Sequence, residues 1–305
     1  MKRVIDLNPW EATHPVSQEK AKEKIERAFP HLQPVQVRPC GSGFDHTVYE
    51  VNGEFVFRFP RRQLGYEAMQ FENRMLRSLV KLRFNGGFEY PRPVFYKESE
   101  SEDYPYVGFS NIKGRVLTEK TDTDLLHQHA EELGAFLKNL HALPVDQVDA
   151  DPDHLHRLSS KLRKKHFYEI AKESASVIPE PLYEKLKQYI EQLEEWENPA
   201  GTVPLHGDLH PKNMIVRDGR LVGIIDWGDA HIGHPAADLS IGFACMSKAV
   251  RAEFFEAYGD IDARTEELAR FKAVFIMTVL VRYAANTNDE DVLRWGLAGL
   301  EKSLE

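Results

Sequence analysis

Short runs of β-branched and aromatic residues, separated by turn residues, dominate the first third of the chain. Their composition and spacing are typical of strands, which we expect over 35–38, 44–51, 54–59, 94–96 and 104–110. Asn52-Gly53 stands between two of these runs and is a strong signal for a two-residue hairpin turn. Apolar residues recur at helical spacing over 65–80, and Ser17 has the position of an N-cap for a helix reaching Phe29. The pattern predicts a small, mostly antiparallel sheet with one main helix.

After Gly114 the pattern becomes helical. Apolar positions at helical spacing predict helices over 124–142, 155–174, 181–196, 248–258, 266–284 and 289–303. A hairpin interrupts them, with strands over 213–217 and 220–226 joined by Asp218-Gly219. We expect the basic run within 157–166 to be the solvated face of a helix. The chain is therefore expected to be α+β, with one domain over 1–110 and a mostly helical second domain over 111–305.

The net charge and its distribution along the chain indicate which classes of partner the protein can bind. The 305 residues carry a formal net charge of −9, which argues against a nucleic-acid-binding protein, since that function needs a basic surface. Residues 1–113 hold 17 basic and 15 acidic residues, whereas the remainder holds 22 basic and 33 acidic ones. The acidic surplus fits a cationic small-molecule partner, and it fits equally a surface that is acidic for solubility.

The two cysteines, Cys40 and Cys245, cannot form a disulfide framework and suit a reducing compartment. The longest apolar run, 273–281, is too short to span a bilayer, and the first residues lack the apolar core of a signal peptide. We therefore expect a cytoplasmic protein with no membrane partner.

One segment concentrates the residues that carry chemistry. It has the pattern His206-x-Asp208-x-x-x-x-Asn213, and the hairpin that follows ends at Asp226. The hairpin brings Asn213 and Asp226 alongside each other, and their oxygens are the donors that Mg²⁺ prefers. Asp208 can accept a proton from an attacking hydroxyl. Each residue alone would more often cap a turn or begin or end a strand, so the prediction depends on the whole set.

The same region offers an alternative, a metal-dependent hydrolase. Its imidazoles and carboxylates are potential zinc ligands: His206, Asp208, His210, Asp226, Asp229, His231 and His234. Gly207 and Pro211 argue against a helix that presents His206 and His210 together. The sequence also lacks the pattern His-Glu-x-x-His.

Residues 206–213 together with Ile225-Asp226-Trp227-Gly228 resemble the catalytic and metal motifs of the aminoglycoside and macrolide phosphotransferase family. The resemblance implies a bilobal, protein-kinase-like fold, with a nucleotide-binding N-lobe over 1–110 and a helical C-lobe over 111–305. It implies that Asp208 is the catalytic residue and that Asn213 and Asp226 bind Mg²⁺. Asp238 matches a family position that is usually structural.

The resemblance also implies a nucleotide site in the N-lobe. The loop Gly41-Ser42-Gly43-Phe44 resembles the phosphate-covering loop of the aminoglycoside 2″-phosphotransferases, although by itself this pattern is more typical of an ordinary hairpin. Val56 and Arg58 share one face of a strand, and Arg58 stands where the family has a phosphate-binding lysine.

The partner implied for Arg58 is Glu72, with Glu67 as the alternative. Residues 106–114 resemble the family hinge, in which backbone groups at Ser110 and Ile112 would bind the purine edge. Because backbone groups make this contact, the side chains do not distinguish ATP from GTP.

The function implied is transfer of the γ-phosphoryl group of ATP or GTP to a hydroxyl of an antibiotic, with Mg²⁺ as cofactor. The Gly41 loop and the hinge resemble aminoglycoside 2″-phosphotransferases, whereas 58–62 and Asp226-Trp227 resemble macrolide 2′-phosphotransferases. The acidic C-lobe fits a cationic acceptor. Two alternatives stay open: a metabolic kinase of an amino alcohol or sugar, and a non-catalytic nucleotide-binding protein.

Overall fold

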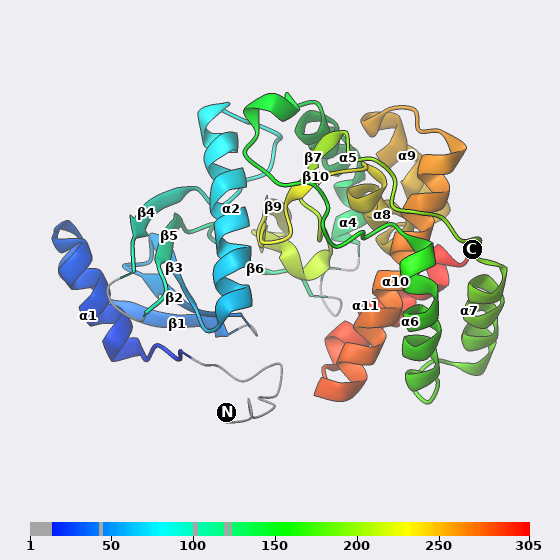
Figure 1. Ribbon diagram of the computed structural model, residues 1–305, viewed down its shortest axis with the longest axis horizontal. Coiled ribbons are helices and arrows are strands. Elements are labelled where there is room, and N and C mark those ends of the chain that lie inside the picture. Colours follow the sequence, from blue (N-terminus) through cyan, green and yellow to red (C-terminus); the bar gives the residue numbers. More distant parts are fainter. Residues whose placement is uncertain (1–13, 43–44, 100–102, 119–121, 123) are drawn as a thin grey trace, which may run out of the picture. The chain divides into compact units, whose positions relative to one another are not determined.

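The computed structural model describes residues 14–42, 45–99, 103–118, 122 and 124–305, and the chain divides into two compact units (Figure 1). Unit 1 comprises the described residues up to Leu82 together with Tyr90–Lys113 and Trp227–Asp229. Unit 2 comprises Arg83–Glu89, the described residues of Gly114–Asp226, and Ala230–Glu305. The chain passes into unit 2 at Gly114, where the sequence pattern changes from strands to helices.

Unit 1 contains an antiparallel sheet with the strand order β1-β2-β3-β5-β4. Its strands are β1 (Val37–Ser42), β2 (His46–Val51), β3 (Phe55–Pro60), β4 (Pro93–Lys97) and β5 (Tyr106–Ser110). Its helices are α1 (Gln18–Ala28), the short 3₁₀ helix η1 (Pro30–Leu32) and α2 (Gln63–Lys81). The predicted antiparallel sheet with one main helix is confirmed, with strand ends that differ by a few residues.

Local turn and cap chemistry explains this part of the fold. Asn52 and Gly53 both have left-handed backbone angles, φ 53° and 69°, and together with Glu54 they form the turn. The predicted hairpin is present, but its turn has three residues and not two, because Val51 pairs with Phe55. The turn joins β2 to β3, and it is fixed further because the Asn52 side chain accepts a hydrogen bond from the backbone N–H of Gln36. Ser17 caps α1 by accepting a hydrogen bond from the N–H of Lys20, as predicted.

Aromatic and aliphatic side chains between α1 and the sheet form a core in unit 1. Phe57, Val51 and Ile25 are fully buried there, and the Phe57 ring stacks on Phe95 at 5.5 Å. Helix α2 contacts β3 and β4 and buries an apolar stripe, Met69, Met75, Leu76 and Leu79. Glu72, 1% exposed, belongs to the same buried face, so the helix carries a carboxylate into an apolar contact.

Unit 2 is mainly helical. Its helices are α4 (Leu125–Gln128), α5 (Ala130–His141), α6 (Ser160–Glu173), α7 (Glu180–Gln192), α8 (Ala236–Cys245), α9 (Lys248–Tyr258), α10 (Ala263–Thr287) and α11 (Glu290–Ser303), with 3₁₀ helices η2 (Val145–Gln147) and η3 (Pro211–Asn213). Asp262 and Asp289 cap α10 and α11 through the N–H groups of Thr265 and Val292. No helix within the described residues has the length and apolarity needed to cross a bilayer.

Helix α8 is a long element that the sequence pattern did not predict. All ten of its residues are buried, so it has no polar face, and without a polar face there is no helical periodicity to detect. It packs against α10 and α11. Asp238, fully buried in its first turn, is the charged residue of this helix.

Two small sheets complete unit 2. The first contains β6 (Arg115–Val116), β8 (Met214–Arg217) and β9 (Arg220–Ile224), and the second pairs β7 (Val203–Leu205) with β10 (His231–Gly233). The turn between β8 and β9 has Asp218 and Gly219 at φ 51° and 73°, which confirms the predicted hairpin. Strands of two or three residues are too short to give a pattern in the sequence.

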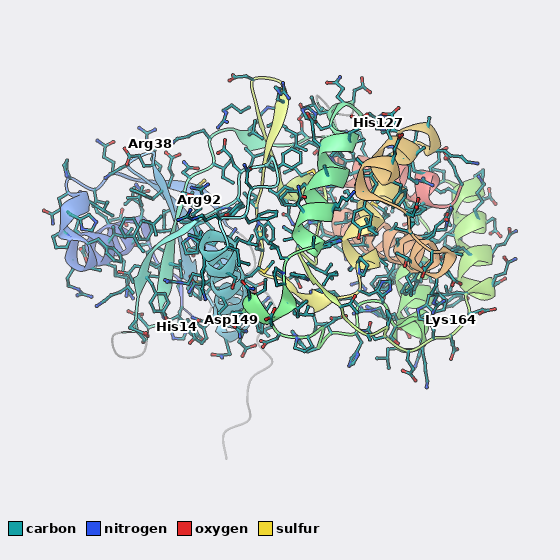
Figure 2. The ribbon with its side chains drawn as sticks, turned by 90° about the horizontal axis from the view of Figure 1, so that it is seen from above. His14, Arg38, Arg92, His127, Asp149 and Lys164 are labelled. Atoms are coloured by element: carbon teal, nitrogen blue, oxygen red, sulfur yellow. The ribbon has the colours of Figure 1, made fainter. Side chains whose placement is uncertain are left out.

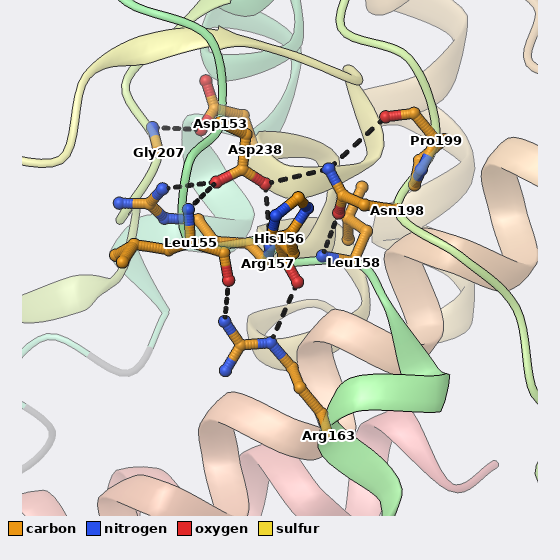
Figure 3. A network of polar contacts seen from close by, with 10 residues as sticks. All are labelled: Asp153, Leu155, His156, Arg157, Leu158, Arg163, Asn198, Pro199, Gly207 and Asp238. Carbon is orange, nitrogen blue, oxygen red and sulfur yellow. Dashed lines mark hydrogen bonds and ion pairs between the residues drawn. The ribbon is translucent and has the colours of Figure 1, made fainter.

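The expectation that 157–166 forms a solvated basic face is partly wrong. Arg157, 6% exposed, pairs with the Asp153 carboxylate at 2.7 Å. Arg163 donates hydrogen bonds to the carbonyl oxygens of Leu155 and His156 (Figure 3), and Lys164, labelled in Figure 2, donates to that of Leu193. These cations hold irregular backbone in place, because carbonyl groups outside a helix need donors when water is excluded.

Candidate functional site

The loop that contains Asp208 joins β7 to η3, and a buried carboxylate anchors it. Asp238 accepts hydrogen bonds from the backbone N–H groups of His206 and Gly207, both at 2.8 Å, and the Gly207 contact is visible in Figure 3. Gly207 has φ 87°, a conformation that a side chain would strain. The Asp208 side chain that follows is 33% exposed. The loop thus has a fixed backbone and an accessible carboxylate.

His206 connects this loop to the strand that precedes Asp226. Its imidazole is fully buried, with Nδ1 accepting a hydrogen bond from the N–H of Asp208 at 3.3 Å. Nε2 donates to the carbonyl oxygen of Ile225 at 3.0 Å. Both ring nitrogens therefore serve the backbone, and within the described part of the chain no three His, Cys, Asp or Glu side chains gather as a metal site. The hydrolase alternative has no ligand set there.

Positive charges surround the Asp208 carboxylate. Its Oδ2 lies 3.4 Å from Nε2 of His210. Burial by itself would raise the pKa of Asp208, but the charge and hydrogen bond of His210 and the charge of Lys272 outweigh it and hold that pKa below its ordinary value. Asp208 is consequently an anion at physiological pH, in the state required to accept a proton or to orient a hydroxyl.

His210 responds in the opposite direction. Burial would lower the pKa of its ring, but the charge of Asp208, and more weakly that of Asp226, raises that pKa above its ordinary value. Sequence reasoning considered His210 as a zinc ligand and missed Lys272 entirely. Lys272 is 7% exposed in the middle of α10 and lies within an apolar stretch, so its position in the sequence gives no sign of a function.

Asn213 is oriented so that its amide oxygen is available. Its Nδ2 donates to the backbone carbonyl of Asp208 at 2.9 Å and lies 3.3 Å from Nε2 of His210. Within the described residues, Oδ1 of Asn213 makes no hydrogen bond. The N–H of Ile225 donates to the Asn213 carbonyl at 2.8 Å, and this contact places the next residue, Asp226, beside Asn213.

Asp226 is exposed and has φ 66°, a left-handed backbone conformation that aspartate tolerates better than most residues. The amide oxygen of Asn213, at the end of η3, and the exposed carboxylate of Asp226, just after β9, form a pair of hard donors that fits Mg²⁺, which keeps several of its waters. The hairpin geometry expected from the sequence brings these two residues together.

In unit 1, Arg58 and Glu72 form an ion pair. Nη1 of Arg58 lies 2.7 Å from Oε2 of Glu72, and the two side chains are 14% and 1% exposed. The second carboxylate oxygen of Glu72 accepts a hydrogen bond from the N–H of Trp227 at 3.3 Å. Glu67, the alternative partner, is exposed and accepts instead from Gln63. Glu72 therefore holds both Arg58 and the backbone immediately after Asp226.

The loop expected to cover phosphates is described only in part. Gly41 and Ser42 form the end of β1, where the pairing with β2 shifts register between Pro39 and Ser42. Gly43 and Phe44 lie outside the described residues. Val56 pairs with Phe109 across β3 and β5.

The predicted hinge lies at the end of β5. Both the N–H and the hydroxyl of Ser110 are bonded to the backbone of Arg92, which is labelled in Figure 2. The side chain of Ile112 is 9% exposed, whereas its N–H makes no hydrogen bond within the described residues.

The Arg58–Glu72 pair has a stability consequence. Replacing Glu72 with Gln removes the buried carboxylate charge from beside a nearly buried guanidinium, so we expect the free energy of unfolding to fall by about 3 kcal/mol in urea denaturation. The matched control is Glu89→Gln, which removes the exposed Arg217–Glu89 pair and should cost about 0.5 kcal/mol or less. Equal losses in the two variants would contradict a tightly coupled Arg58–Glu72 pair.

A family model described as the phosphotransferase enzyme family matches residues 36–273. Viomycin phosphotransferase of Streptomyces vinaceus is 24% identical over 270 residues, which cover 84% of this chain and 89% of that protein. An uncharacterized protein of Bacillus subtilis strain 168 is 24% identical over 125 residues, 39% of this chain, and the chain spans only 40% of the length of this relative.

Solved structures share the fold. The GDP complex of wild-type aminoglycoside 2′-phosphotransferase-IIIa has a TM-score of 0.65 and 23% identity, covering 94% of this chain and 98% of that one. The macrolide 2′-phosphotransferase of Brachybacterium faecium has a TM-score of 0.57 and 20% identity, covering 92% and 98%. The predicted α+β, protein-kinase-like fold is confirmed. Since the family model matches well over half of its length, the chain belongs to the phosphotransferase enzyme family.

Proposed function

We propose that the protein transfers the γ-phosphoryl group of ATP or GTP to a hydroxyl group of a small molecule. One observation supports this above the others, the arrangement of the loop from Asp208 to Asn213. There the Asn213 amide nitrogen holds the Asp208 backbone, the amide oxygen stays available to a cation, and the Asp208 carboxylate is anionic and accessible. A loop of this kind suits phosphoryl transfer, in which catalysis is mainly positioning and charge stabilisation.

Unit 1 would bind the nucleotide. In the proposal, the N–H of Ile112 and backbone groups at Ser110 contact the purine edge, and Val56 provides an apolar surface beside it. Arg58, held by Glu72, binds phosphate oxygens. Its two-pronged guanidinium suits phosphate as well as the carboxylate it already pairs with. Backbone N–H groups of the 41–44 loop would cover the phosphates.

Asn213 and Asp226 would hold Mg²⁺. When bound, Mg²⁺ neutralises charge on the phosphate oxygens and favours departure of the nucleoside diphosphate. The chain prepares the pair through contacts already present, the Ile225–Asn213 hydrogen bond and the contact of Trp227 with Glu72.

Asp208 would act on the acceptor. It orients the acceptor hydroxyl and takes its proton while the hydroxyl oxygen bonds to the γ-phosphorus. The bond between that phosphorus and the β,γ-bridging oxygen breaks, and the diphosphate leaves with the electron pair. The positive surroundings of Asp208 keep the carboxylate ionised before the reaction begins.

We propose an antibiotic as the acceptor, with an aminoglycoside favoured over a macrolide. The support is the similarity to an aminoglycoside 2′-phosphotransferase and to viomycin phosphotransferase, together with the 33 acidic against 22 basic residues after Lys113. Such a charge balance attracts polycationic acceptors. The reaction would take place in the cytoplasm, where both nucleotides are available and an exposed thiol such as Cys40 remains reduced.

The test is a phosphoryl-transfer screen of the purified protein with Mg²⁺ and either ATP or GTP. The acceptor panels are aminoglycosides, macrolides, viomycin, amino alcohols and sugars. We expect stoichiometric conversion of an aminoglycoside to its phosphate ester, with one nucleotide preferred. Conversion of an amino alcohol or sugar alone would overturn the antibiotic assignment. Nucleotide binding with no transfer to any acceptor would overturn the catalytic one.

Cys40 provides an independent test of nucleotide binding in unit 1. Its side chain is exposed and directly precedes the 41–44 loop. Partial desolvation, followed by the charge of Glu50, raises the pKa of its thiol, so the thiolate needs mildly alkaline pH to form. Alkylation at mildly alkaline pH should therefore modify Cys40 and spare the buried Cys245, whose pKa is raised to about 12. We expect saturating Mg²⁺ nucleotide to slow modification by roughly tenfold, as measured by peptide mass spectrometry. An unchanged rate would contradict binding beside β1.

A further inference from the structure

We propose that Tyr258 and His141 are positioning residues for the catalytic loop. The inference rests on the function proposed above and adds to it two residues that do not touch substrate. Nε2 of His141 lies 3.3 Å from Oδ2 of Asp238, and Nδ1 of His141 lies 2.9 Å from the hydroxyl of Tyr258. Oδ2 of Asp238 is also the acceptor for the N–H of His206. The contacts run without a break from the end of α9 to the loop that carries Asp208.

Protonation fixes the direction of these contacts. Burial by itself would raise the pKa of Asp238, but the hydrogen bond and charge of His141 and the N–H of Gly207 hold that pKa below its ordinary value. A carboxylate can only accept, so Nε2 of His141 must carry a proton. Burial raises the pKa of Tyr258 to about 12, so its hydroxyl keeps its proton. That hydroxyl can donate to a neutral ring or accept from a protonated one, and either way it fixes the ring plane.

Close packing of α5 against α9 determines the positions of His141 and Tyr258. A Cβ atom on Gly134 would lie 2.3 Å from the carbonyl oxygen of Phe254, so a glycine is needed there for the helices to approach. Gly134 precedes His141 by two helical turns, and Phe254 precedes Tyr258 by about one. Residues at these spacings share a helix face, so both contacts belong to the same interface. The close packing of the two helices therefore places the Tyr258 hydroxyl within hydrogen-bond distance of the His141 ring.

The consequence for the loop follows from the number of bonds on Asp238. Its two oxygens accept from Gly207, His206 and His141 together, and the carboxylate is fully buried. If the imidazole of His141 could rotate, its hydrogen bond to Asp238 would vary and the Asp238 carboxylate would shift. The backbone of His206 and Gly207, which is bonded to that carboxylate, would shift with it. Asp208 follows Gly207 directly, so a displaced loop backbone also displaces the Asp208 carboxylate. Errors of about 1 Å cost up to roughly 100-fold in rate.

Tyr258→Phe removes one hydroxyl and keeps the ring that packs on His141. We expect kcat to fall by about tenfold, with KM for nucleotide and acceptor unchanged within about twofold, because binding groups are untouched. The kcat of His141→Leu should be lower still. The kcat of His141→Gln should lie between that of His141→Leu and wild type, because the glutamine amide can still donate to Asp238. If His141→Leu fails to fold, Tyr258→Phe alone carries the test.

The matched control is Tyr49→Phe in unit 1, which removes a similar phenol hydrogen bond, to the carbonyl of Val16 at 2.8 Å. It should lower the melting temperature comparably and leave kcat unchanged. Equal kcat values in Tyr258→Phe, Tyr49→Phe and wild type would overturn the inference, whereas a wild type without transfer would overturn the proposed function instead. In that event the amide ¹H–¹⁵N resonance of Gly207 decides: we expect it to shift in Tyr258→Phe and not in Tyr49→Phe, and an unshifted resonance refutes the inference.

Discussion

Asp208→Asn should lower kcat by about 10³-fold while nucleotide affinity stays within about threefold of wild type. Asparagine has nearly the same shape as aspartate but can neither take a proton nor attract one. The residues proposed to bind nucleotide, Arg58 and Ile112, belong to unit 1, and Asn213 keeps its bond because that bond goes to the backbone carbonyl of residue 208. The loss should therefore appear in turnover and not in binding.

Steady-state kinetics measures kcat with the acceptor found in the screen, and calorimetry measures the affinity for nucleotide. Asp262→Asn is the control, since it removes a carboxylate from unit 2 and leaves an asparagine, which caps α10 equally well. Turnover of Asp208→Asn within about tenfold of wild type would remove Asp208 from the role of base.

Asp226→Asn should produce the second large effect, a loss of about 10³-fold in kcat together with a weakened dependence of nucleotide binding on Mg²⁺. The substitution removes the charged donor of the proposed metal pair. It should not disturb the fold, because asparagine also tolerates the left-handed backbone found at φ 66°. Loss of activity with an unchanged melting temperature is the expected combination.

Asp218→Asn is a close control for Asp226→Asn. Asp218 occupies the turn of the same hairpin, also in a left-handed conformation, at φ 51°, but no metal role is proposed for it. Titrating Mg²⁺ at fixed nucleotide in both variants separates the effects. If Asp226→Asn and Asp218→Asn titrate alike, Asp226 does not bind the metal.

The sequence was sufficient wherever local chemistry decides the structure. Asn52-Gly53 and Asp218-Gly219 predicted their hairpins because few residues other than asparagine, aspartate and glycine accept two consecutive left-handed conformations. The second of these hairpins is what places Asp226 beside Asn213. The Arg58–Glu72 pair followed from the resemblance to the family and has the geometry expected of it.

Features that depend on tertiary packing were not predictable. Helix α8 has no polar face, and Lys272 lies in an apolar stretch of α10, so neither gives a periodic signal. The helix expected from 155 begins at Ser160, because Asp153 accepts the N–H groups of Leu155 and Arg157 and holds that segment outside the helix. His141 and Tyr258 are 117 residues apart, and nothing in the sequence indicates that they meet.

The most direct test of phosphoryl transfer follows the γ-phosphoryl group itself. Nucleotide labelled with ¹⁸O at the non-bridging γ-oxygens would be incubated with Mg²⁺, the acceptor and the protein, and the acceptor analysed by mass spectrometry. We expect an acceptor phosphate ester that retains the full ¹⁸O label, formed by wild type and nearly absent with Asp208→Asn. Label found only in inorganic phosphate, at equal rates in the two proteins, would contradict the proposed transfer.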